Sequence, residues 1–152
     1  MEPALRAGDR VLVLRPFLDR DLARGDVVVV DVRGAFVPGV ATTGPLAGTV
    51  LAPAPAQAYL VKRVIGLPGD RVRCCDADGS LVVNGQPLDE PYLARGVDPS
   101  QDLFDVAVPS GRLWLMGDNR TVSEDSRAHL GSPGGGTVAE RAVVGRVVGA
   151  VP

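Results

Sequence analysis

The chain has 152 residues, a net charge of −2 and 45% hydrophobic residues, which suits one domain, residues 1–152, with a sizeable core. This charge excludes the broad basic face that nucleic-acid-binding proteins usually carry. No apolar run approaches the roughly 18 residues of a membrane span, and Met1 does not open the apolar core of a signal peptide. The sequence as given therefore predicts a soluble body.

Short β-rich runs, separated by Gly, Pro and Asp, dominate the pattern. The expected strands are Arg10–Leu14, Asp26–Val32, Tyr59–Ile65, Arg71–Cys75, Leu81–Val83, Leu113–Met116 and Ala142–Val148. Turn signals at Ala77–Ser80 and Asn84-Gly85 predict a hairpin over Arg71–Val83 followed by a second tight turn. Asp125–Leu130 could form one helical turn, but no window keeps a helical period over three turns. We expect a mainly β fold of antiparallel sheets with long irregular loops.

The segment Gly34–Ala58 has a different composition from the rest of the chain. It is rich in Ala, Pro, Gly and Thr and contains no charged residue. Its few large apolar side chains predict a flexible insert between two strands, and the alternative is a short β-excursion within it. Gly131–Gly136 is expected to be a second flexible loop, and it is not a phosphate loop because no Gly-Lys-Ser/Thr follows.

The two cysteines, Cys74 and Cys75, are neighbours. Two thiols alone do not make a zinc site. A bridge between trans neighbours would be strained, because their Cα atoms lie about 3.8 Å apart, below the usual disulfide range. Free thiols, a vicinal bridge and a bridge between chains all stay open. The single histidine, His129, is expected to be structural or exposed.

Lys62 is the only lysine among the 16 basic residues, and it lies in an apolar run. Arginine cannot replace lysine where the group must lose its proton, so Lys62 is a candidate neutral base. A free lysine has a pKa of about 10.4 and is only about 0.04% neutral at pH 7, whereas an effective base needs a pKa nearer 7, and burial can supply such a shift. Strand alternation places Val64, not Val61, on the face of Lys62. The alternative is a lysine that simply pairs with a carboxylate.

Several segments then follow one another in a distinctive order. They are Met1–Leu5, Gly8–Val13, Arg24–Val29, Lys62–Asp70, Val83–Tyr92 and Gly117–Arg127. This series resembles the type I signal peptidases, the membrane-bound serine proteases that remove secretory signal peptides. The resemblance runs nearly end to end and leaves out only residues 34–58. It implies antiparallel sheets of the signal-peptidase type.

The resemblance also implies a Ser/Lys dyad, in which a serine attacks the scissile carbonyl and neutral Lys62 takes its proton. The family's nucleophile stands in Ser-Met-x-Pro, so here it would precede Met1. We therefore expect the chain as given to bind like a signal peptidase without cleaving. The family's upstream membrane helix would also precede Met1.

Other roles are implied residue by residue. Ser123 would orient the Lys62 amine, and an Asp125–Arg127 ion pair would support that segment. Arg63 and Asp118 would pair across the two motifs. The alternative for Ser123, Asp125 and Arg127 is an ordinary polar turn.

The resemblance places the substrate-binding residues around the Ala-x-Ala end of a signal peptide, which would add as a strand. They are Met1, Pro3, Leu5, Leu60 and Val61, for which the alternative is ordinary core. The implied partners are signal peptides of secretory preproteins and the lipid bilayer surface, with the full-length protein in the cytoplasmic membrane and its catalytic domain on the extracytoplasmic face. No cofactor, metal, nucleotide or nucleic acid is implied. The competing hypotheses are a self-cleaving repressor-type Ser/Lys protease and a noncatalytic signal-peptide-binding module.

Overall fold

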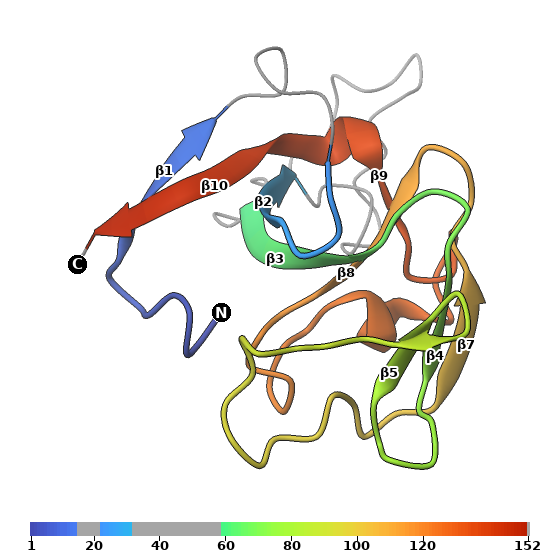
Figure 1. Cartoon of the computed structure of the whole chain (residues 1–152). Helices are drawn as coiled ribbons and strands as arrows, with labels where there is room; N and C mark the ends of the chain where they lie inside the picture. The colour runs from blue at the N-terminus through green and yellow to red at the C-terminus, as the bar shows by residue number, and fades with distance from the viewer. Residues whose placement is uncertain (15–21, 32–58, 152) are drawn as a thin grey trace, which may run out of the picture.

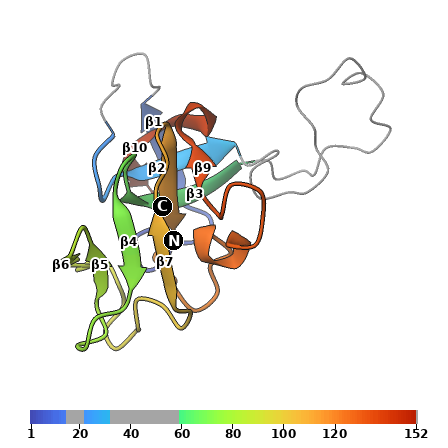
Figure 2. The same cartoon turned by 90° about the vertical axis from the view of Figure 1, so that its right-hand side faces the viewer.

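A computed structural model describes residues 1–14, 22–31 and 59–151, which form two antiparallel sheets (Figure 1). The strand order is β1-β10-β2-β3-β8-β9 in the larger sheet and β6-β5-β4-β7 in the smaller one. The strands are β1 Arg10–Leu14, β2 Val27–Asp31, β3 Tyr59–Gly66, β4 Arg71–Cys74, β5 Leu81–Val83, β6 Gln86–Pro87, β7 Phe104–Ala107, β8 Arg112–Met116, β9 Val138–Ala139 and β10 Val143–Val151. Figure 2 shows β4 and β7 side by side, with β5 and β6 flanking β4.

The prediction of a mainly β, antiparallel fold is confirmed. All seven expected strands are present, with ends that differ by up to three residues, as at Val151 of β10. The β4–β5 hairpin is also present, and the tight turn after it contains Asn84 at φ 53° and Gly85 at φ 81°. The expected helical turn is a 3-10 turn over Ser126–His129. The predicted insert, residues 34–58, lies outside the described residues.

Strands β3 and β8 separate two hydrophobic clusters, and this position explains their apolar sequences. Side chains alternate between the faces of a strand, so neighbouring residues bury into different clusters. On β3, Val64 packs in one cluster with Val28 and Val30, while Ile65 packs in the other with Trp114. Lys62 lies two residues before Val64, so its side chain is on the face of β3 that carries the first cluster. The side chain of Arg63 is on the face that carries the second cluster.

Three strands begin after the same kind of Gly-Asp turn. In each, the glycine has φ near +90°, which only glycine adopts easily. In each, the aspartate side chain accepts a hydrogen bond from the backbone N–H three residues earlier, at 2.7 to 2.8 Å. The aspartates are Asp9 before β1, Asp26 before β2 and Asp70 before β4. These turns fix the starts of two strands of the larger sheet, β1 and β2, and of one strand of the smaller sheet, β4.

Cys74 and Cys75 form a disulfide with each other at the end of β4, so the vicinal bridge is the one of the three open alternatives that the structure contains. Both residues pack against the second cluster, which also holds Phe104 and Trp114. Gly131–Gly136 forms a loop whose last three glycines all have positive φ. Over the described ranges, no helix is long and apolar enough to cross a bilayer.

Candidate active site

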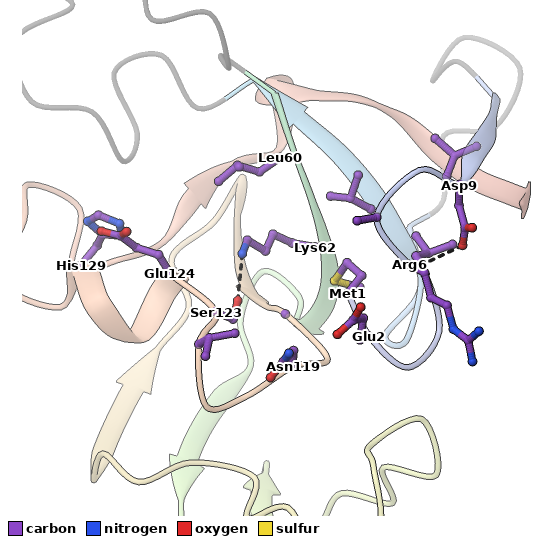
Figure 3. A pocket seen from close by; sticks show the side chains of 16 residues that line it. Met1, Glu2, Arg6, Asp9, Leu60, Lys62, Asn119, Ser123, Glu124 and His129 are labelled. Carbon is purple, nitrogen blue, oxygen red and sulfur yellow. Dashed lines mark hydrogen bonds between the residues drawn. The ribbon is translucent and has the colours of Figure 1, made fainter. Parts of the chain in front are cut away.

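Lys62 lies in the middle of the larger sheet, on β3, where it pairs with Val28 of β2. The residue is only 8% exposed. Its Nζ donates a hydrogen bond of 2.8 Å to Oγ of Ser123, and Figure 3 shows the two side chains pointing toward each other. The sheet thus holds the amine rigidly while a loop supplies its hydrogen-bond partner.

The surroundings of Lys62 favour its neutral form. Desolvation by burial lowers the pKa of the Lys62 amine below its ordinary value, and the positive charge of Arg127 adds to this effect. The carboxylates of Asp125 and Glu124 act in the opposite direction, but they do not outweigh burial. The direction of the shift is the one that a lysine base requires.

Asp125 organises the loop that carries Ser123. Its fully buried carboxylate accepts hydrogen bonds from the backbone N–H of Gly117 at 3.0 Å and from Nε and Nη2 of Arg127, both at 2.9 Å. Burial alone would raise the pKa of the Asp125 carboxyl. The bonds and charge of Arg127, with the Gly117 N–H and the Ser123 side chain, outweigh burial and hold the pKa below its usual value. Asp125 is therefore ionised, and it ties both ends of the loop together.

Arg63 lies on the opposite face of β3 from Lys62. It donates two hydrogen bonds to the Asp118 carboxylate, at 2.8 and 2.7 Å, and a third of 2.7 Å to the carbonyl of Gly25. Asp118 is 1% exposed. The pair joins the lysine strand to the start of the Gly117–Arg127 loop, so it fixes the two motifs relative to each other.

A pocket with a cavity volume of about 760 Å³ opens beside Lys62. Six of the residues assigned from the sequence line it, namely Met1, Leu5, Leu60, Val61, Lys62 and Ser123. Pro3 is not among the lining residues. The four supporting residues, Arg63, Asp118, Asp125 and Arg127, are not among the lining residues either. The roles given to all of these residues stay predictions.

The pocket also contains polar residues that sequence reasoning missed. Glu2, Arg6, Asp9, Asn119, Glu124 and His129 line it and are labelled in Figure 3. His129 is half-buried and faces the pocket, so it is not simply a surface residue. Several of these residues lie beside assigned ones within the same motifs, and that adjacency was the available signal. Within the described ranges, no group of three or more His, Cys, Asp or Glu side chains could hold a metal ion.

Comparison with known proteins shows the family of this chain. The family model described as signal peptidase, peptidase S26, matches residues 1–151. Signal peptidase I of Mycobacterium tuberculosis H37Rv is 45% identical over 106 residues, which cover 60% of this chain and 36% of that protein. Signal peptidase I T of Bacillus subtilis 168 is 32% identical over 154 residues, covering 95% of this chain and 65% of that protein.

A solved structure has a similar fold. The crystal structure of a signal peptidase I from Enterococcus faecalis V583 has a TM-score of 0.54, and the match covers 83% of this chain and 96% of that one at 24% identity. The family model covers nearly the whole chain, so the chain belongs to the type I signal peptidases of the S26 peptidase family. The chain spans less than two thirds of the length of these relatives from Mycobacterium tuberculosis and Bacillus subtilis.

Proposed function

We propose that this chain is the catalytic body of a serine endopeptidase that removes signal peptides after Ala-x-Ala-like sites. The observation that carries the proposal is the 2.8 Å contact between Lys62 Nζ and Ser123 Oγ within a pocket that Met1 also lines. A serine immediately before Met1 would therefore enter the same pocket as the amine. Neutral Lys62 would take the proton from that serine as it attacks the scissile carbonyl.

Ser123 has a supporting role in this proposal. Its hydroxyl accepts from Lys62 Nζ, which orients the amine, and its hydrogen bond with Asp125 is consistent with the same orientation. The backbone N–H of the serine before Met1 would provide part of the oxyanion hole. Residues 1–152 alone would then bind a signal peptide without cleaving it.

The substrate would lie as an extended strand along the apolar wall formed by Leu5, Leu60 and Val61, with small side chains facing the pocket. Signal peptides are presented at a membrane, so the partners would be secretory preproteins and the lipid surface. The whole protein would then be attached to the cytoplasmic membrane and act on its extracytoplasmic face.

The test compares two polypeptides that differ at one position. In both, a few residues precede Met1, and the last of them is serine in one and alanine in the other. Both are incubated with a peptide that contains an Ala-x-Ala site, with detergent or lipid present, and the products are identified by mass spectrometry. We expect the serine form to cleave after the small residue and the alanine form to lose more than about 10³-fold in rate. Equal activity would place the nucleophile elsewhere, and binding without cleavage by both forms would favour the noncatalytic module.

A further inference from the structure

A buried ion pair between Glu90 and Arg120 lies outside the pocket. It links the segment between β6 and β7 of the smaller sheet to the loop that carries Ser123. The Glu90 side chain is 5% exposed and that of Arg120 is 1% exposed. Both Glu90 carboxylate oxygens accept from Arg120, and Oε1 also accepts from the hydroxyl of Tyr92 at 2.7 Å. Glu90 thus follows β6 in the chain yet contacts the Gly117–Arg127 loop directly.

Arg120 connects Glu90 to the backbone near the Lys62 amine. Its Nε donates to the carbonyl of Gly117 at 3.0 Å, and its own carbonyl accepts from Arg127 Nη2 at 3.0 Å. Gly117 lies so close to the site that a Cβ there would be 2.1 Å from Ser123 Oγ and 3.5 Å from Lys62 Nζ. The Arg120 guanidinium therefore fixes the Gly117 peptide group, which lies beside the contact between Ser123 and Lys62.

Tyr92 connects the same segment to the lysine strand. Its ring lies 3.9 Å from the guanidinium carbon of Arg63 and 6.0 Å from that of Arg120. Arg63 follows Lys62 on β3, so one short segment touches both halves of the site. Stacking of guanidinium groups on an aromatic ring is attractive, and burial strengthens it.

We propose that Glu90 is a positioning residue, which acts through Arg120 to hold the Ser123 loop against Lys62. Buried ion pairs are poor stabilisers, since desolvation offsets much of their attraction, and an apolar pair would join the two segments as well. The hydrogen bonds of the Arg120 guanidinium, in contrast, are directional, so they fix the position of the Gly117 peptide group. The role in catalysis rests on the proposed function, whereas the geometric link between Glu90 and Lys62 does not.

The test uses Lys62 as its own reporter. Because it is the only lysine, lysine labelled with ¹³C at Cε gives one side-chain NMR signal in the 152-residue chain. The signal is titrated in the unchanged protein, in Glu90→Gln and in Asp89→Asn, a matched carboxylate-to-amide change at an exposed neighbour. Tyr92→Phe removes only one hydrogen bond to Glu90 and no charge. This readout needs no activity, so its failure is separate from failure of the proposed function.

We expect Glu90→Gln to let water reach the amine and to raise the Lys62 pKa by about 0.5 unit or more. Tyr92→Phe should give a smaller rise, and Asp89→Asn none. A fall in the Lys62 pKa after Glu90→Gln would mean that the variant acts on Lys62 only through the unpaired charge of Arg120, because a nearby cation lowers a lysine pKa. A fall or an unchanged titration overturns the proposal. If Glu90→Gln does not fold, the titration of Tyr92→Phe decides, and no rise there overturns it.

Discussion

Arg127 donates two side-chain hydrogen bonds of 2.9 Å to the Asp125 carboxylate, although the two residues are only two positions apart. Both are buried, and the carboxylate also holds the N–H of Gly117. Their pair therefore closes the loop that carries Ser123.

Asp125→Asn should destabilise the fold by about 3–5 kcal/mol, because it leaves the Arg127 charge buried without its partner. Urea unfolding at pH 7 measures the loss. Asp105→Asn is the matched control, since Asp105 forms an ion pair with Arg71 in which the side chains are 42% and 70% exposed. The control should unfold at nearly the same urea concentration as the unchanged protein, and equal losses for both variants would contradict the account.

The same pair makes stability depend on acid. The pKa of Asp125 is lowered in the folded state, so its contribution is fully present above the unfolded value of about 3.9. It is lost as the pH falls through the folded value. Acid unfolding followed by circular dichroism should therefore depend less on pH below 4 in Asp125→Asn. An identical acid profile would show that Asp125 is not ionised in the fold.

Gly117→Ala should displace Ser123, since the added Cβ would lie 2.1 Å from Ser123 Oγ. We expect a loss of more than about tenfold in kcat for the serine-extended protein, because the lysine loses its oriented partner. Gly131→Ala is the control, as a Cβ there meets nothing within 4 Å and φ is not positive. Normal peptide cleavage by Gly117→Ala would show that Ser123 does not orient Lys62.

Lys62→Met should stabilise the fold near pH 6 by about 1 kcal/mol or more, because folding of the unchanged protein must either bury the charged amine or remove its proton well below its ordinary pKa. In the unchanged protein the lowered pKa means that the unfolded chain binds more protons between the folded value and about 10.4. Its stability therefore rises with pH in that window, and the gain from Lys62→Met should shrink. Urea unfolding at pH 6 and pH 9 tests this, and a gain that does not change with pH would contradict it.

The strands and the candidate site residues could be predicted from the sequence for different physical reasons. The β-branched and aromatic residues of Tyr59–Ile65 identify β3 locally. Because Lys62 is the only lysine, it is identified without any structure. Strands such as β9, Val138–Ala139, were not predicted, because two residues form a strand only when β8 is beside them. The Glu90–Arg120 pair was not predicted either, because its partners are 30 residues apart and local sequence patterns do not show which distant residues meet.

The titration of Lys62 tests most directly whether it can act as the proposed neutral base. Its single ¹³Cε signal can be titrated in the folded chain and again in concentrated urea, where the same lysine serves as its own reference. The account predicts that the folded chain titrates well below the unfolded value of about 10.4, because burial disfavours the charged amine. The same titration in the folded and unfolded chains would contradict it.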